Sequence, residues 1–438
     1  SAAKHPRQRH DEDHIAAEEM YRGPMIYFSE DMEYEEVVDY WDGKSLREAL
    51  EDKDIKLNNL RILLDRKYAQ IESHLRALVG RSELVDFAKD FKKRHAFAGI
   101  ELDVFVQAFE ARFGIDVRDI LDKYYEGKML PVFYVRDMKV ELFEEEKYAQ
   151  KIASCKVYNP SPMDGTVTIL ERGTSGEGGS SSGKHSFLVP ARGCKEIRIV
   201  LGSDDYFFLD MNLCQNIPGN KLMEFGENRL EKTKNGHTGI WDTDSSVFLR
   251  KEPGLVVDDD NVIIHEKKKR EKLAVYFSEK TEHKKYEYIY DHERWTHVTS
   301  SECYGDIVKS AYYKMAGTGK SEVEWRVKID APGVYDVLVY VPNIQVTPAR
   351  GTFIKGARLF YRIGSNEGMT DVEVILDNED AGWISLGKFD FNAGEYSVLL
   401  SDRGGDSLSW EKTEDYGWEG DAVQLIFADA VRWVPVKR

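Results

Sequence analysis

The chain has 438 residues, 42% of them hydrophobic, which is enough for roughly two to four domains with sizeable cores. Its formal net charge of −17 argues against electrostatic, sequence-independent binding to phosphate groups. We therefore expect neither nucleic acid nor an anionic membrane as a partner. No apolar run is long enough to span a bilayer, and the first residues lack the apolar core of a signal peptide.

Residues 1–44 begin with a stretch rich in Arg, His and Asp, and we interpret them as a polar N-terminal segment. Residues 45–130 are predicted to form a helical bundle, because their apolar residues recur at helical spacing. The pattern runs through Leu60, Leu63, Leu64, Tyr68, Ile71, Leu84, Phe87, Phe91, Leu102, Phe105 and Phe109. Gly114 is placed to end one of these helices.

The hydrophobic period changes from 3.6 to 2 after Pro131, which indicates strands. Residues 131–215 are predicted to form a small β-sandwich whose short strands cover 133–135, 140–143, 156–158, 166–170, 186–190 and 196–200. We interpret the Gly- and Ser-rich segment 173–183 as a flexible hairpin tip, since it lacks the helix of a phosphate-binding loop and has no lysine followed by Ser or Thr at the required place.

Residues 216–284 mix Gly, Asn, Asp and Lys with short apolar runs, and we interpret them as a linker with some strand. Residues 285–438 return to a clear strand pattern and are predicted to form a β jelly roll. Its strands cover 323–329, 334–341, 358–363, 371–376, 384–386, 396–401 and 428–433. The fold class is therefore multidomain α+β, with a helical bundle, a small β-sandwich and a jelly roll in that order.

The last segment resembles the golvesin/xanthan-lyase C-terminal domain over about 145 residues. The motifs that carry this resemblance are Trp295-Thr296-x-Val298, Tyr304-Gly305, Gly333-x-Tyr335-Asp336-Val337, Gly382-Trp383-x-x-Leu386-Gly387-x-Phe389-x-Phe391-x-x-Gly394, Val398-x-Leu400-Ser401-Asp402 and Ala428-Asp429-Ala430-Val431-Arg432. The resemblance implies a galactose-binding-like jelly roll that attaches to carbohydrate or a cell surface. The sequence departs from the family with extra loops at 342–357 and 403–420.

The N-terminal half resembles, more weakly, the region downstream of the active site in gluzincin zinc aminopeptidase-like proteins. Its motifs are Phe87-x-x-x-Phe91, Phe105-x-x-x-Phe109, Phe113-Gly114-x-Asp116, Leu130-Pro131-x-Phe133 and Phe208-Leu209-Asp210. The zinc motif His-Glu-x-x-His is absent. The nearest string, from His10 to His14, lacks the glutamate that would activate water.

Aromatic side chains in polar, turn-rich segments of the jelly roll are the candidate ligand contacts, because flat rings stack on sugar faces while charged groups bond the hydroxyls. The candidates are Trp383, Arg403, Trp410, Tyr416 and Trp418. Packing is the competing interpretation for each tryptophan, most strongly for Trp383 at the start of a strand.

Calcium is the one cofactor that the sequence leaves open, because loops of β-sandwiches can gather several oxygen ligands. The weak candidate ligands are Asp377, Glu379 and Asp380. The four cysteines, Cys155, Cys194, Cys214 and Cys303, form no Cys-x-x-Cys pair. We expect buried free thiols, with a Cys155–Cys194 bridge as the alternative in an exported chain.

The sequence thus predicts a non-catalytic protein that binds a glycan or attaches to a cell-surface polysaccharide, as the downstream part of a larger exported protein. Its location, inferred from the resemblance, is extracellular, periplasmic or at the cell surface. Two alternatives remain open at this stage. One is a structural spacer beside an upstream peptidase-like or membrane part, and the other is a polysaccharide hydrolase with unrecognised carboxylates.

Overall fold

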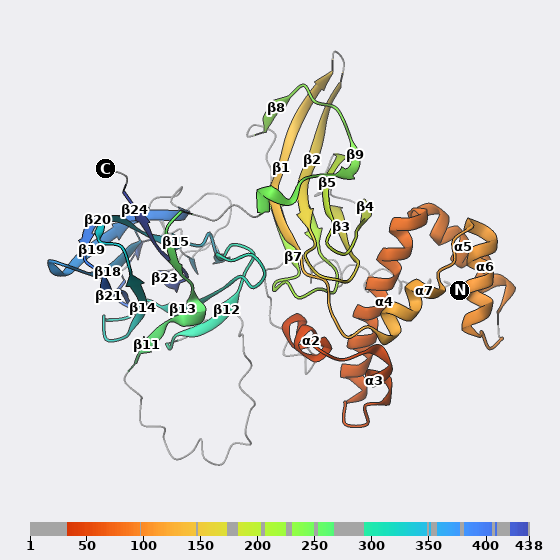
Figure 1. Cartoon of the computed structure of the whole chain (residues 1–438), viewed down its shortest axis with the longest axis horizontal. Helices are drawn as coiled ribbons and strands as arrows, with labels where there is room; N and C mark the ends of the chain where they lie inside the picture. The colour runs from red at the N-terminus through yellow and green to blue at the C-terminus, as the bar shows by residue number, and fades with distance from the viewer. Residues whose placement is uncertain are drawn as a thin grey trace, which may run out of the picture. The chain divides into compact units, whose positions relative to one another are not determined.

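The computed structural model divides the chain into two compact units, which are described separately (Figure 1). The N-terminal unit covers Asp31–Glu252 with Gly305–Lys309, and the C-terminal unit includes Pro253–Tyr304 and Ser310–Arg438. The structure describes residues 33–96, 98–145, 148–172, 183–202, 206–224, 230–248, 253–266, 293–347, 350–351, 357–376, 381–404, 408–409 and 421–436.

The N-terminal unit begins with helices, as the apolar spacing predicts for residues 45–130. They are α2 (Tyr34–Trp41), α3 (Leu46–Glu51), α4 (Leu57–Val79), α5 (Arg81–Arg94), α6 (Leu102–Phe113) and α7 (Arg118–Glu126). Phe87 lies at the centre of the α5–α6 contact, with its ring centroid 5.3 Å from that of Phe109 and 5.8 Å from that of Phe105. Gly114 ends α6 with a left-handed φ of 69°, where its N–H bonds the Glu110 carbonyl.

The strands of the N-terminal unit form a sandwich of two sheets. They are β1 (Tyr134–Glu145), β2 (Tyr148–Tyr158), β3 (Gly165–Arg172), β4 (Lys184–Val189), β5 (Cys194–Leu201), β6 (Tyr206–Asp210), β7 (Asn220–Glu224), β8 (Glu231–Thr233) and β9 (Gly239–Asp242), followed by the 3-10 helix η2 (Ser245–Phe248). Sheet I has the order β8-β1-β2-β5-β9 and sheet II the order β4-β3-β6-β7. Val140, Cys155 and Ile197 of sheet I share a buried core with Val167 and Leu209 of sheet II.

Strand β1 is a single strand where the sequence analysis predicts two, over 133–135 and 140–143. The pairing of β1 with β2 shifts its register between Arg136 and Lys139, and Asp137 lies within the shift with a φ of 52°. The alternation of side chains is broken at such a bulge, although the strand continues. The broken alternation is what makes one strand look like two in the sequence.

The described part of the C-terminal unit is built from strands and the 3-10 helix η3. They are β10 (Leu255–Val257), η3 (Asp259–Asn261), β11 (Ile263–His265), β12 (Thr296–Thr299), β13 (Ser310–Met315), β14 (Glu322–Ile329), β15 (Gly333–Val341), β16 (Gln345–Thr347), β17 (Arg350–Gly351), β18 (Arg358–Ser365), β19 (Gly368–Ile375), β20 (Gly382–Phe391), β21 (Gly394–Ser401), β22 (Leu408–Ser409), β23 (Asp421–Ala428) and β24 (Val431–Pro435). Sheet III is ordered β10-β24-β15-β20, sheet IV is β11-β14-β21-β18-β19 and sheet V is β12-β13-β23-β17-β16.

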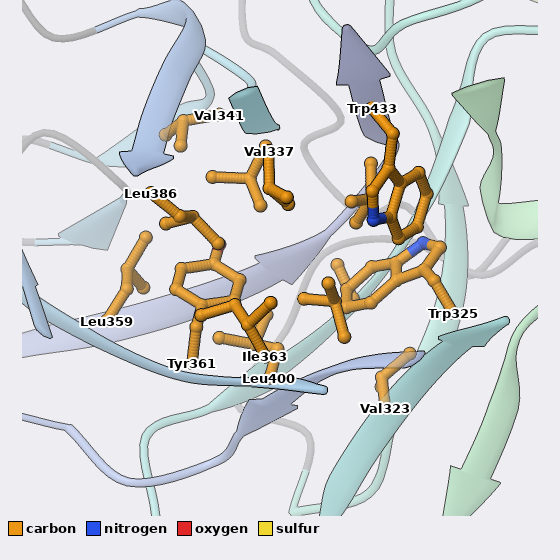
Figure 2. Close-up of a cluster of buried hydrophobic side chains, with 14 of the residues drawn as sticks. Val323, Trp325, Val337, Val341, Leu359, Tyr361, Ile363, Leu386, Leu400 and Trp433 are labelled. Atoms are coloured by element: carbon orange, nitrogen blue, oxygen red, sulfur yellow. The ribbon is translucent and has the colours of Figure 1, made fainter. Parts of the chain in front are cut away.

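Sheets III and IV enclose the main core of the C-terminal unit. Trp325, Tyr361 and Leu400 of sheet IV and Val337 and Trp433 of sheet III belong to one buried cluster, and Figure 2 shows their side chains gathered together. The inward residues alternate with outward ones, as the period-2 pattern predicts. Truncating an aromatic such as Trp325, which is 1% exposed, costs about 3–5 kcal/mol in cores of this kind.

The motif Ala428-Asp429-Ala430 connects two sheets of the C-terminal unit. The sequence analysis predicts one strand over 428–433, but β23 ends at Ala428 in sheet V and β24 begins at Val431 in sheet III. The Trp325 indole N–H donates to the Asp429 carbonyl at 2.9 Å, and the Tyr340 N–H donates to the Ala430 carbonyl at 2.8 Å. These bonds replace the hydrogen bonds between paired strands at the point where the chain passes from sheet V to sheet III.

The predicted multidomain α+β class, with a helical region followed by β-sandwich domains, is confirmed. All four cysteines are buried and free, so the alternative Cys155–Cys194 bridge is not formed. Within the described residues, no helix combines the length and the apolarity needed to cross a membrane.

Candidate functional site

The candidate residues of the sequence analysis fall into two groups. Trp410, Tyr416 and Trp418 lie outside the described residues, as do the calcium candidates Asp377, Glu379 and Asp380. Within the described residues, no group of three or more His, Cys, Asp or Glu side chains is arranged to hold a metal ion. The structure therefore places two of the candidates, Trp383 and Arg403.

Three neighbouring strands of sheet III bring Trp383 together with residues that are distant in sequence. Tyr340 of β15 pairs with Trp383 of β20, and β24, which carries Arg432, pairs with β15 from its other side. Tyr340 lies between the buried Val339 and Val341, and Arg432 lies between two buried residues of β24. Because side chains alternate along a strand, all three project from the outer face of sheet III, away from the core.

Tyr304 completes this group, which we call the aromatic patch: Tyr304, Tyr340, Trp383 and Arg432. The Trp383 ring centroid lies 5.1 Å from that of Tyr304 and 5.4 Å from that of Tyr340, both edge to face. The two tyrosine rings are 5.6 Å apart, and the Arg432 guanidinium carbon lies 4.1 Å from the indole centroid. All four side chains are half-buried, so the patch is packed and still partly open to solvent.

A buried carboxylate holds Tyr304 in the aromatic patch. The Tyr304 backbone N–H donates to Asp429 Oδ2 at 3.0 Å, and Asp429 is only 1% exposed. The Asp429 carbonyl in turn accepts the bond from the core residue Trp325. A bond from a backbone N–H to a buried carboxylate is charge-assisted and therefore strong. The patch is thus attached to the rigid core of the unit.

The chemistry of the aromatic patch suits a ligand with both apolar faces and hydroxyl groups. Its rings offer flat apolar surfaces, and its guanidinium and indole N–H are donors fixed in orientation. The Trp383 N–H makes no hydrogen bond with a described residue. Shallow sites of this composition bind sugar rings by stacking and by hydrogen bonds to hydroxyls.

Arg403 lies on the opposite outer face of the sandwich. Its guanidinium carbon is 4.5 Å from the ring centroid of Phe360, whose neighbours Leu359 and Tyr361 are buried in the core. Phe360 therefore projects outward from sheet IV. The structure does not bring Arg403 and Trp383 into one site. The pairing of one ring with one arginine at Phe360 provides a smaller surface than the three rings of the aromatic patch.

A buried charge network holds the chain just before Arg403. The Lys314 Nζ lies 2.8 Å from Asp402 Oδ2 and 3.5 Å from Glu266 Oε1. Ser321 joins the network by donating from its hydroxyl to Glu266 and from its N–H to Asp402 Oδ1. The Lys314 and Asp402 side chains are 9% and 4% exposed, so this is an internal clamp rather than a binding surface.

A second buried cluster contains the residue types of a hydrolase triad in the wrong order. Asp259 Oδ2 lies 2.7 Å from His297 Nε2, and its Oδ1 accepts a bond of 3.2 Å from the Ser310 hydroxyl. In a working triad the serine donates to the histidine, which takes its proton. Here the carboxylate lies between the two, and among the described contacts the serine hydroxyl bonds Asp259 rather than the histidine. The cluster ties η3 to β12 and β13.

Sequence analysis identifies one member of the aromatic patch and misses the other three. Tyr340 and Arg432 alternate with apolar residues on ordinary strands, and nothing in the sequence shows that their strands are neighbours. Tyr304 belongs to a motif of the resemblance, but its contact with Trp383 depends on the bond to Asp429. Only knowledge of the strand pairing would have grouped these residues.

Residues 281–409 match the family model of the Golvesin C-terminal domain. This segment is therefore golvesin-like, in agreement with the resemblance that the motifs indicate. The match does not extend to the helical region, so the resemblance of the N-terminal half to gluzincin peptidases is unsupported. No curated protein matches the sequence.

Among solved structures, the chain is similar to a xanthan lyase from Paenibacillus, with 12% identity and a TM-score of 0.27 over 70% of this chain and 27% of the lyase. The chain thus spans about a quarter of that enzyme. It is also similar to an exo-β-1,3-galactanase from Phanerochaete chrysosporium, with 10% identity and a TM-score of 0.22 over 67% of this chain and 68% of the other. Both TM-scores are too low to support a functional argument.

Proposed function

We propose that the golvesin-like segment is a non-catalytic carbohydrate-binding module and that the aromatic patch is its ligand contact. The observation that carries the proposal is the packing of three rings and a guanidinium on the outer face of sheet III. The family match supports it independently, because the resemblance implies attachment to carbohydrate or a cell surface. The protein would act outside the cytoplasm, on the polysaccharide of a cell surface.

Binding at the aromatic patch would combine stacking with directed hydrogen bonds. Trp383 is the central ring, because it contacts both tyrosines and the guanidinium. A saccharide would place the C–H face of one sugar ring against the exposed parts of these rings. The indole N–H and the guanidinium would then donate to its hydroxyl oxygens. A packed patch needs little reorganisation on binding, and this lowers the free-energy cost of forming the complex.

Two features of the described residues favour a binding role over catalysis. The buried Asp259, His297 and Ser310 cluster lacks the order that activates a serine, and the aromatic patch contains no carboxylate. A hydrolase of polysaccharides would need a pair of carboxyl groups beside the bound sugar. The hydrolase and the spacer remain the competing functions that an experiment must separate from the proposal.

A panel of immobilised polysaccharides tests the proposal with the whole chain. We expect saturable binding to at least one neutral polysaccharide, with no release of reducing ends. The Trp383→Ala variant should bind about tenfold more weakly, because truncating a central ring of a binding patch costs about 1–2 kcal/mol. Hydrogen exchange in β14 and β21 should be unchanged, which would show that the core is intact.

One further variant locates the site, and two further outcomes separate the alternative functions. A Trp410→Ala plus Trp418→Ala variant tests the loop that the sequence analysis favours. If this variant loses binding while Trp383→Ala keeps it, the module binds glycan but not at the aromatic patch. Absence of binding to every polysaccharide would favour the spacer, and release of reducing ends that one carboxylate substitution abolishes would establish the hydrolase.

A further inference from the structure

The outer face of sheet I in the N-terminal unit carries a pocket that the golvesin match does not cover. Its volume is about 340 Å³, and its polar lining, which defines the sheet-face pocket, consists of Asp137, Lys139, Ser154, Lys156, Glu196 and Arg198. Pockets for small molecules span about 300–1,000 Å³, so this one has room for one or two sugar rings. All six residues come from β1, β2 and β5.

The strand register places these side chains in two rows across sheet I. One row runs from Lys139 through Ser154 to Arg198, and the other runs from Lys156 to Glu196. Residues directly opposite each other on paired strands project from the same face. The alternate residues Cys155 and Ile197 point into the core. The bulge in β1 adds Asp137 to the second row, 2.8 Å from the Lys156 ammonium.

Trp241 extends the second row at the edge of the sheet. It lies opposite Glu196 in the pairing of β9 with β5, and its side chain is 37% exposed. The neighbouring outward position is Gly239, and a Cβ at that glycine would lie 3.7 Å from the indole ring. The indole of Trp241 therefore lies over the position of Gly239, along the outer face of the sheet.

The charges around the sheet-face pocket balance. Lys139 pairs with Glu141 at 2.9 Å and Lys156 pairs with Asp137, while Arg198 lies 3.5 Å from Glu141 and also donates to two backbone carbonyls. With Glu196, the carboxylates equal the cations in number, and the surface has no net charge to attract an ion. An anion or a metal ion is therefore a poor fit.

Two polar groups of the sheet-face pocket have no hydrogen-bond partner among the described residues. The Ser154 hydroxyl is buried without a hydrogen bond, and Ser154 is 5% exposed. Leaving such a group unpaired costs about 1–3 kcal/mol, which a ligand hydroxyl could recover. The Glu196 carboxylate likewise makes no hydrogen bond with a described residue, although it interacts electrostatically with Lys156 on the neighbouring strand. Both lie in the lining, and Glu196 lies opposite the partly exposed Trp241 in the pairing of β5 with β9.

From this arrangement we infer that the sheet-face pocket is a second saccharide site, specific for a neutral sugar that stacks on Trp241 and bonds Glu196 and Ser154 through its hydroxyls. The site is independent of the aromatic patch, since each is built from the residues of one unit. Because the pocket is neutral, the affinity should change little with salt concentration.

The test is calorimetric titration of the whole chain carrying Trp383→Ala, which isolates the sheet-face pocket. The probes are lactose, cellobiose and maltose, with inorganic phosphate as the charged comparison. We expect millimolar affinity for at least one disaccharide at both low and high salt, and none for phosphate. Adding Trp241→Ala or Glu196→Gln should weaken binding about tenfold or more.

Ile240→Ala is the matched control, because Ile240 is 41% exposed on the same strand and faces the other side of sheet I. It should leave the affinity unchanged. Ligand-dependent protection from hydrogen exchange should appear in β5 and β9. Failure of all three disaccharides to bind, equal effects of Ile240→Ala and Trp241→Ala, or salt-sensitive binding of phosphate would each overturn the inference. None of these results would affect the aromatic patch, which the Trp383→Ala comparison tests.

Discussion

The buried clamp of Lys314, Asp402 and Glu266 predicts an asymmetric response to the loss of each partner. Lys314→Met removes the cation and leaves two carboxylates close together, one of them 4% exposed. Removing one partner of a buried ion pair costs about 3–5 kcal/mol, because the remaining charge is uncompensated. Asp402→Asn should cost less, about 1–3 kcal/mol, since Glu266 still faces the ammonium at 3.5 Å.

Urea unfolding monitored by hydrogen exchange in β13 and β14 measures this response within the C-terminal unit. Lys314→Met should lower the free energy of unfolding more than Asp402→Asn does. The double variant Lys314→Met plus Asp402→Leu should be less destabilised than the sum of the single changes, because neither charge is then left alone. Equal, small effects of both single variants would refute the reasoning and show that water screens the pair.

Three further predictions concern ionisable groups of the N-terminal unit. Burial raises the pKa of the Cys155 and Cys214 thiols to about 12, so iodoacetamide should label them at neutral pH only after unfolding. Rapid labelling of the native chain would contradict this prediction. Burial lowers the pKa of Lys67 to about 8, so the unfolded chain binds more protons above that pH and stability should rise from about pH 8 to 10. Lys67→Met should remove this rise in urea midpoints. Burial opposes ionisation of Glu171, but hydrogen bonds from His185 and a backbone N–H outweigh it and leave its pKa lowered. The ionised Glu171 therefore stabilises the fold above about pH 4.5, and this stabilisation is lost as the pH falls through the pKa of the folded state. The urea midpoint of Glu171→Gln should not show this acid-dependent loss.

Local patterns in the sequence predict most of the elements but fail where the chain is irregular. The Phe-rich helical spacing is confirmed in α5 and α6, and the alternating runs are confirmed in β14, β15 and β21. The prediction is wrong at the bulge around Asp137, which interrupts the alternation within one strand. It is also wrong at Asp429, where the alternation continues although the chain passes from one strand to another. Residues 216–265 supply β7 to β11, strands too short to show a period.

The candidate sites depend on pairing between strands that are distant in sequence, which local patterns do not contain. Trp383 is recognisable as an aromatic near a turn, whereas Arg432 becomes its neighbour only because β15 lies between β20 and β24. Trp241 gives an even weaker signal, a tryptophan two residues after a glycine in a strand of four residues. Trp410, Tyr416 and Trp418 stay predictions, as does calcium at Asp377, Glu379 and Asp380.

A comparison of two aromatic truncations decides whether the aromatic patch binds saccharide. Phe360 and Trp383 are both half-buried rings with an arginine guanidinium over them, on opposite faces of one sandwich. The measurement is the dissociation constant of the whole chain and of each alanine variant for the polysaccharide that binds best. We expect a loss of about tenfold for Trp383→Ala and no change for Phe360→Ala. Equal affinities of both variants and the unmodified chain would contradict it.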